Sequence, residues 1–158
     1  MLIFYKFPAG YLGIEHDGEQ IIRMKFISEE IYLDRQNLEL AHYFTNTIRA
    51  KLDAYFEGSG KELYLPLKLE GTEFEIAVLN ACRAIAYGET ATYKQLAEQA
   101  GHPAAARAVG NVMHNNPYPI LIPCHRVVGS DEELHGYAGG LEIKQWLLEH
   151  ESKHKSQS

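Results

Sequence analysis

One short stretch, ILIPCHRVVG at residues 120–129, places the residue types of nucleophilic chemistry side by side. Cys124 is followed directly by His125 and Arg126. A thiol attacks as the thiolate, and an imidazole or guanidinium nearby is the kind of group that lowers its pKa or accepts its proton. A buried cysteine beside a packed histidine is also a common structural arrangement. On these residues alone, the pair is either a reactive thiol or part of a core.

The chain before this pair is rich in proline. Pro117, Pro119 and Pro123 favour an extended, stiff approach to Cys124. Adjacent side chains on an extended chain point to opposite faces, so the imidazole of His125 need not touch the sulfur. This geometry leaves room for a water molecule that bridges the two groups.

Composition limits the setting in which such a thiol works. The chain has 158 residues, a net charge of −6 and only two cysteines, Cys82 and Cys124. Two cysteines are too few for a disulfide framework and do not have zinc-ligand spacing, so we expect reduced thiols, no metal and no cofactor. No apolar run approaches the ~18 residues of a membrane span, and no secretory signal is present. These features predict a cytoplasmic protein with no membrane partner.

The charge gives no general support for nucleic-acid binding. Between Gly71 and Ser130, however, four acidic and four basic side chains balance each other, so this segment has no net charge. It is compatible with a small DNA-binding surface.

The first part of the chain has the pattern of a small sheet with a covering helix. Apolar and polar residues alternate through residues 1–27, and Asp17 and Gly18 mark a tight turn. Apolar residues then recur at three- and four-residue steps from Asn37 to Glu57, where Gly58 is a typical helix stop. This region predicts an antiparallel sheet and one amphipathic helix.

The second part has the pattern of a helical domain. Two capping-box spacings mark helix starts, Thr72 with Glu75 and Thr92 with Gln95. Cys82 lies on the apolar face of the first helix and is interpreted as a small core residue. Gly101 ends the second helix, and a third is expected from Pro103 to Asn116, so the last two helices have the form of a helix-turn-helix.

These elements predict an α+β fold in two domains. Residues 1–70 form the antiparallel sheet with its helix, and residues 71–152 form a mainly helical, winged-helix-like domain that contains the helix-turn-helix. Residues 153–158 are expected to be a flexible tail.

The second helix of the helix-turn-helix carries few groups that can read a base. It is dominated by alanine and glycine, and Arg107 is its single long cation. Readers of the major groove usually present several Arg, Asn, Gln or Lys side chains. The helix is therefore either packed in a core or suited to close approach to a minor groove.

Three stretches together resemble a known family. GETATYKQLAEQAG, PAAARAVGNVMHNNPYPILIPCHRVVGSD and GYAGGLEIKQWLLEHE are similar, in order and spacing, to the O6-alkylguanine-DNA alkyltransferases, nearly continuously from Gly88 to Glu151. The resemblance implies a single-turnover DNA repair enzyme that moves an alkyl group from O6 of guanine to its own cysteine. It also implies, as the partner, alkylated double-stranded DNA bound through the minor groove. We expect a monomer.

The resemblance also implies roles for particular residues. Cys124 would be the nucleophile and methyl acceptor, and His125 a base that acts through a water. Glu151 would orient His125, and Tyr93 would donate a proton to the base and contact a phosphate.

Further residues would bind DNA or the flipped base. Arg107 would enter the base stack beside Ala106, and Asn116 would link the recognition helix to the segment of Cys124. Lys144 would support the pocket. The base pocket would be formed by Met113, Val127, Tyr137, Ala138 and Gly139.

The sequence departs from the family pattern at Leu79, Ala86 and His135, which puts the range of alkyl groups in doubt. Two other functions stay open. One is a helix-turn-helix module that senses alkyl lesions without chemistry, and the other is a cysteine hydrolase or thiol redox sensor.

Overall fold

The computed structural model describes residues 1–130 and 137–155 and divides the chain into two compact units, Met1–Lys68 and Leu69–Ser158. The division falls close to the expected domain boundary at residue 70. Among the described residues, no helix is long and apolar enough to cross a membrane.

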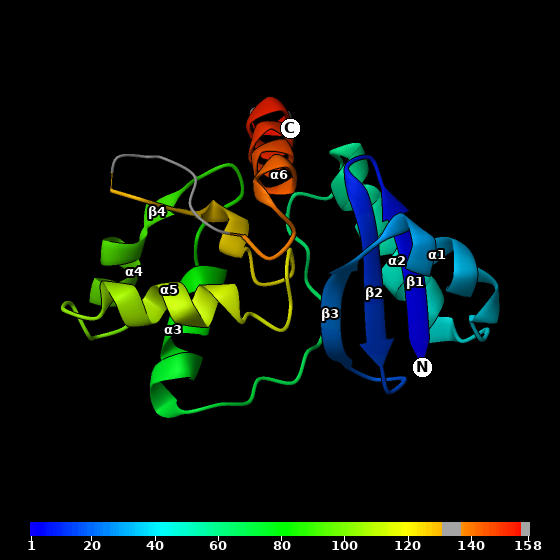
Figure 1. Cartoon of the computed structure of the whole chain (residues 1–158), viewed down its shortest axis with the longest axis horizontal. Helices are drawn as coiled ribbons and strands as arrows, with labels where there is room; N and C mark the ends of the chain where they lie inside the picture. The colour runs from blue at the N-terminus through cyan, green and yellow to red at the C-terminus, as the bar shows by residue number, and fades with distance from the viewer. Residues whose placement is uncertain (131–136, 156–158) are drawn as a thin grey trace. The chain divides into compact units, whose positions relative to one another are not determined.

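The first unit is built on a three-stranded antiparallel sheet in the order β1-β2-β3 (Figure 1). Asp17 accepts hydrogen bonds from the backbone N–H groups of Glu19 and Gln20 at 2.9 and 2.8 Å, and Gly18 has a φ of 95°. The turn expected at these two residues is therefore confirmed. The strands are β1 (Leu2–Phe7), β2 (Gly10–His16) and β3 (Ile21–Ile27).

Helix α2 (Tyr43–Glu57) packs on this sheet, as does the shorter α1 (Glu29–Arg35), whose Tyr32 ring lies against Tyr11 of β2. Helix α2 buries Ile48, Leu52 and Tyr55, and the ring of Phe56 stacks on Phe7 with centroids 4.7 Å apart. The helix ends at Gly58, which is left-handed with a φ of 87°, as expected. Burial of this apolar face is what stabilises the first unit.

The predicted start of this helix at Asn37 is wrong. Residues up to Leu38 belong to α1 (Glu29–Arg35) and the 3₁₀ turn η1 (Gln36–Leu38). Leu38 is 71% exposed, so it does not lie on the buried face that its spacing suggested. The helix begins where His42 caps it, because the ring of His42 accepts the N–H of Phe44.

The second unit is mainly helical, as predicted (Figure 1). Both expected capping boxes are present, at Thr72 with Glu75 and at Thr92 with Gln95. Its elements are α3 (Glu73–Arg83), β4 (Ala91–Thr92), α4 (Tyr93–Gln99), α5 (Ala106–His114), η2 (Cys124–Arg126), β5 (Val127–Val128) and α6 (Leu141–His154).

A short parallel pair, β4 with β5, connects the start of α4 with the chain that follows Cys124. Ala91 pairs with Val127, and Thr92 pairs with Val128. Since Tyr93 follows Thr92 directly, this pairing brings the first residue of the helix-turn-helix beside the segment of the thiol.

Two predicted boundaries differ from the structure. Helix α5 begins at Ala106 instead of Pro103, because residues 103–105 form a turn in which the N–H of Ala105 donates to the carbonyl of His102 at 2.9 Å. Helix α6 continues through His154, past the expected start of the tail at residue 153, and residues 156–158 lie outside the described residues.

Candidate active site around Cys124

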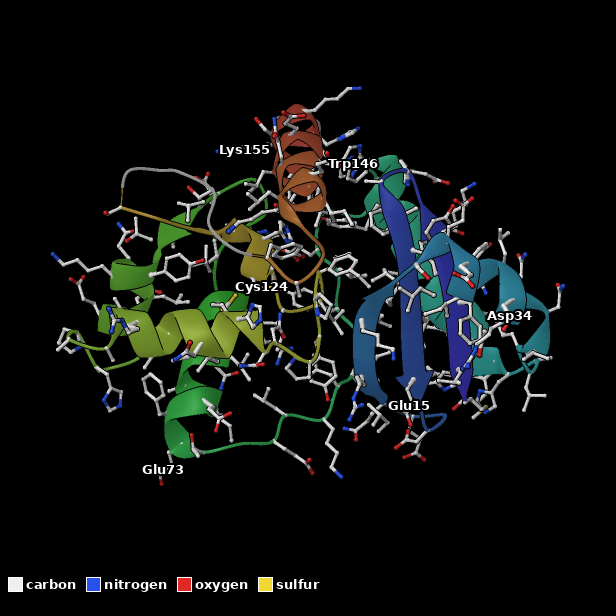
Figure 2. The ribbon with its side chains drawn as sticks, in the orientation of Figure 1. Glu15, Asp34, Glu73, Cys124, Trp146 and Lys155 are labelled. Carbon is white, nitrogen blue, oxygen red and sulfur yellow. The ribbon has the colours of Figure 1, made fainter. Side chains whose placement is uncertain are left out.

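The segment that carries Cys124 is turned and not extended, so the expectation of a stiff extended approach is wrong. The N–H of Ile122 donates to the carbonyl of Tyr118 at 2.8 Å, and Ile120 has a φ of 73°. Cys124 opens the 3₁₀ turn η2, in the interior of the second unit, and is 5% exposed (Figure 2). Prolines exclude a helix here, but they are equally compatible with turns, and burial favours the compact path.

Asn116 fixes this turned segment to the end of α5. Its Nδ2 atom donates to the carbonyl of Ile122 at 2.8 Å, and its Oδ1 atom accepts the N–H of Tyr118 at 2.9 Å. One side chain therefore holds two points of the loop that leads to Cys124. The structure brings Asn116 to the place where the sequence resemblance put it.

The thiol of Cys124 has surroundings that act on its pKa in opposite directions. Burial raises the pKa, whereas hydrogen bonding from Asn116, the charge of Lys144 and hydrogen bonding from Tyr137 lower it, and the net shift is upward. Cys124 is thus a thiol, not a thiolate, in the resting protein near neutral pH. A reaction at the sulfur needs a group that takes its proton.

Lys144 is a buried cation whose charge acts on Cys124. It is 1% exposed, and its Nζ atom donates to the carbonyl of Val127 at 2.7 Å. Burial lowers the pKa of Lys144, and the charge that would form on Cys124 raises it. Lys144 is therefore positioned to stabilise a thiolate.

His125 is buried with only one of its two ring nitrogens engaged by the described chain. Its Nε2 atom lies 2.7 Å from Oε2 of Glu151. Glu151 is a charged acceptor, so Nε2 carries the proton and Nδ1 carries the lone pair. Within residues 1–130 and 137–155, Nδ1 forms no hydrogen bond. Burial lowers the pKa of His125, which keeps the ring neutral near neutral pH.

Glu151 holds a buried negative charge. Burial acts to raise the pKa of Glu151, but His125 and Arg126 outweigh it and keep that pKa well below its usual range. Arg126 donates to both carboxylate oxygens, from Nε at 2.8 Å and from Nη2 at 2.9 Å. The sequence suggested that Arg126 acts on the thiol, but the guanidinium is engaged by Glu151.

Tyr93 lies close to both Cys124 and helix α5. Tyr93 is half-buried at the first turn of α4, and burial and the charge of Cys124 raise its pKa. A Cβ atom on Gly110 would lie 4.0 Å from the ring of Tyr93, so α5 passes close to it. Tyr93 is therefore near both the thiol and the recognition helix.

Helix α5 has one face in the core and exposes its long cation on the outside. Val109 and Met113 are buried, so one face of the helix packs in the core. Arg107 is exposed at the first turn, and Ala106 beside it is half-buried. A buried apolar face and an exposed arginine therefore occur on the same short helix.

The loop expected to recognise the base is described only from Tyr137 onward. The N–H of Gly140 donates to the carbonyl of Tyr137 at 2.9 Å, and Gly140 has a φ of 93°. Ala138 is exposed and Gly139 is half-buried in this turn. His135, one of the departures from the family pattern, lies outside the described residues.

Three other residues that were singled out from the sequence lie in α3 or shortly after it. Cys82 is fully buried in α3, as predicted, and Leu79 is 3% exposed on the same helix. Ala86 is exposed. Within the described ranges, no group of three or more His, Cys, Asp or Glu side chains has a metal-binding arrangement.

Sequence reasoning missed two contacts of Glu151, those from Arg126 and Gly88. The N–H of Gly88 donates to Oε1 of Glu151 at 3.2 Å, and Gly88 has a φ of 77°. A glycine after a tyrosine in AYGET was a sign of a special backbone position, but nothing in the sequence linked it to a residue 63 positions away.

Comparison with known proteins assigns both units to domains of one family. Residues 73–153 match the model described as 6-O-methylguanine DNA methyltransferase, DNA binding domain, and residues 2–69 match 6-O-methylguanine DNA methyltransferase, ribonuclease-like domain. A methylated-DNA–protein-cysteine methyltransferase of Methanosarcina acetivorans is 40% identical over 146 residues, which cover 91% of this chain and 93% of the relative.

Two solved structures from Mycobacterium tuberculosis are similar over nearly the whole chain. An O6-methylguanine methyltransferase is 34% identical with a TM-score of 0.85, and the match covers 100% of this chain and 97% of that one. A structure of OGT in complex with DNA is 34% identical with a TM-score of 0.83, over 97% of this chain and 93% of that one.

Proposed function

The chain belongs to the family of 6-O-methylguanine DNA methyltransferases, and from that premise we propose that it repairs DNA by moving an alkyl group from O6 of guanine to Sγ of Cys124. One observation carries the proposal. Beside a buried thiol lies His125, a buried and neutral histidine whose one nitrogen is held by Glu151 while the other keeps its lone pair. This is the order of a nucleophile, a base and a group that orients the base.

The transfer is a single displacement. The proton of the Cys124 thiol passes through a water molecule to Nδ1 of His125, and Sγ attacks the methyl carbon of the lesion. The S–C bond forms as the C–O6 bond breaks, and the electron pair of that bond stays on guanine, which takes up a proton. The product thioether has no route back to the thiol, so each protein reacts once.

Residues around the sulfur stabilise the charge that forms on either side of this step. Lys144, Asn116 and Tyr137 lower the pKa of Cys124 against the effect of burial, and so favour the thiolate. Tyr93 supplies the proton that guanine takes up. Its raised pKa keeps the hydroxyl protonated near neutral pH, as a donor needs.

The base pocket uses the backbone beyond Cys124. The carbonyls of Cys124 and Val127 and the turn at Ala138 and Gly139 face the guanine edge in this proposal. Val127 already accepts a hydrogen bond from Lys144, but a carbonyl oxygen has two lone pairs and can accept a second donor.

The partner is double-stranded DNA that contains an alkylated guanine. In the proposed complex, α5 lies in the minor groove, since its small residues allow close approach of the backbone. Arg107 then fills the place of the flipped nucleotide, next to Ala106. The protein acts as a monomer in the cytoplasm, where a reduced thiol persists.

The chain of Cys124, His125 and Glu151 favours this function over the two alternatives. A module that only senses lesions has no use for a base held beside a thiol. A cysteine hydrolase would use the pair, but it gives no reason for a small-residue helix that exposes Arg107.

Mass spectrometry of the protein after incubation with duplex DNA containing O6-methylguanine tests the proposal. We expect one methyl group per protein, located on Cys124 by peptide mapping. Cys82→Ser should still accept the methyl group, and Cys124→Ser should not. An unchanged mass, a methyl group on Cys82, or repeated turnover would contradict the proposed function.

The role of Arg107 is tested by two substrates. Arg107→Ala should slow the reaction with duplex DNA by about tenfold or more, because flipping a paired base costs a few kcal/mol, and should leave the reaction with free O6-methylguanine unchanged. Arg83→Ala, which removes an exposed arginine from α3 of the same unit, is the matched control. Equal losses on both substrates would rule out a role in flipping.

A further inference from the structure

The carboxylate of Glu151 accepts at least four hydrogen bonds. Its Oε2 atom accepts from His125 Nε2 at 2.7 Å and from Arg126 Nη2 at 2.9 Å. Its Oε1 atom accepts from Arg126 Nε at 2.8 Å and from the N–H of Gly88 at 3.2 Å. A carboxylate offers about four lone-pair positions, so Glu151 cannot take up a proton without losing a bond. It therefore acts as a fixed charge and not as a proton carrier.

Arg126 is itself fixed by contacts on its other side. The guanidinium is buried, and its Nη1 atom donates to the carbonyl of Ile85, two residues after the end of α3, at 2.7 Å. Its central carbon lies 5.6 Å from the centre of the Tyr87 ring. A planar guanidinium that is itself held by contacts on its other side fixes the plane and the position of the carboxylate that it binds.

We propose that Arg126 is a positioning residue of the transfer reaction: it holds Glu151 in place beside His125, and its positive charge keeps His125 neutral and able to accept the thiol proton. The proposal deepens the proposed function and rests on it. Arg126 touches neither the thiol nor the substrate in this proposal, and it acts through Glu151 and His125.

The charges around His125 explain why a second cation is useful. Burial, Arg126 and Lys144 lower the pKa of His125, and Glu151 raises it. Two neutral titratable groups near this network, Tyr87 and Cys82, have pKa values raised by burial. Lys155, whose side chain lies against Gly88, is charged but pairs with Glu89. Without Arg126, the full charge of Glu151 would attract a proton onto Nδ1 in the resting protein. An imidazolium has no lone pair and cannot accept the proton of Cys124.

The test measures the reaction with free O6-methylguanine across a range of pH. The free base removes any effect on DNA binding. In Arg126→Met, the acidic limb of the rate profile, where the rate falls as pH is lowered, should shift to higher pH by roughly one to two units. This is the usual effect of a nearby charge on a pKa. Arg126→Lys keeps the charge but loses the fork. It should leave the limb in place and lower the rate at every pH, by about tenfold.

A second measurement needs no substrate. Nitrogen NMR of the His125 ring should show a neutral Nε2–H form near neutral pH in the wild-type protein and a protonated ring in Arg126→Met. This titration is defined whether or not the protein transfers methyl groups. Failure of the proposed function and failure of the role of Arg126 are therefore distinguishable.

Two control variants complete the design. In the double variant Arg126→Met/Glu151→Gln, the carboxylate that attracts the proton is gone, so the acidic limb should not move upward. Arg83→Met removes an exposed arginine and should change neither readout. A folded Arg126→Met with the wild-type limb and the wild-type titration of His125 would overturn the proposal. If circular dichroism shows Arg126→Met unfolded, a wild-type rate for Arg126→Lys at every pH would overturn it.

Discussion

The two units each bury a histidine, and the two histidines are held differently. His16, in the first unit, is 1% exposed and has both ring nitrogens engaged. Its Nε2 lies 2.9 Å from Oγ1 of Thr45, and its Nδ1 accepts the N–H of Gly18 at 3.1 Å. His125, in the second unit, has Nε2 held by Glu151 and Nδ1 without a hydrogen bond inside the described ranges.

The difference distinguishes a structural histidine from one that has the arrangement of the proposed base. A buried nitrogen without a partner costs free energy, of the order of 1–3 kcal/mol, and natural structures rarely keep such an atom without a use. Both ring nitrogens of His16 have hydrogen-bond partners when the ring is neutral. These two bonds connect the turn at Gly18 to Thr45 in α2. His125 follows Cys124 directly in the sequence and keeps a lone pair on Nδ1, so in the proposed function it accepts the thiol proton. Burial alone would not have told these residues apart.

The largest expected difference is in the rate of transfer. His125→Phe should slow the reaction with free O6-methylguanine by about 10²–10⁴-fold, because the base is lost. His16→Phe should leave that rate within about a factor of two, since His16 belongs to the first unit and to none of the contacts around Cys124. Mass spectrometry of samples quenched at a series of times, which follows methylation of Cys124, measures both rates. Similar rates for the two variants would break the distinction.

The next effect is on stability. Thr45→Val removes the acceptor of His16 Nε2 with little change of shape and should lower the free energy of unfolding by about 1–3 kcal/mol. Thr47→Val, at an exposed position of the same helix, should change it by no more than about 0.5 kcal/mol. Urea unfolding compares the two variants. The rate of methyl transfer should be that of the wild-type protein in both, and a loss of rate in Thr45→Val would contradict a purely structural role.

The smallest effect is the dependence of stability on pH. Burial lowers the pKa of both His16 and His125, and the N-terminal amine and His42 lower that of His16 further. Below about pH 6.5 the unfolded chain binds protons that the folded chain does not, so stability falls as pH falls. Each group contributes at most about 1.4 kcal/mol per pH unit.

Unfolding in urea at several pH values measures this loss. His16→Phe should flatten the dependence between about pH 7 and pH 5, because one of the two groups is gone. The pKa of Glu151 is also lowered, so its contribution is present above about pH 4.5 and is lost as pH falls below that. Stability that rises on acidification between pH 7 and pH 5 would contradict the lowered pKa values.

Local signals in the sequence were enough to predict several elements, but they left the pair of Cys124 and His125 as either reactive or structural. The capping boxes at Thr72 and Thr92 act within one turn of helix, so four residues determine them. The turn at Gly18 and the helix stop at Gly58 depend equally on single residues. Cys124 and His125 are adjacent, and the family resemblance then supplied Glu151.

The rest depends on contacts between distant parts of the chain. Arg126 was assigned to the thiol because it is near in sequence, but its partner Glu151 lies 25 residues away and Ile85 lies 41 residues away. The left-handed backbone at Ile120 is unusual for a β-branched residue, and no local preference predicts it. Tertiary packing fixes both features.

The position of Glu151 in the chain has a consequence for the order of synthesis. Cys124, His125 and Arg126 leave the ribosome before Glu151, which follows His125 by 26 residues. Until α6 folds against η2, the imidazole has no acceptor for its Nε2 proton and the guanidinium has no carboxylate to bind. In the proposed function, the nascent thiol therefore has no oriented base until α6 folds, and the folding of α6 completes the proposed site.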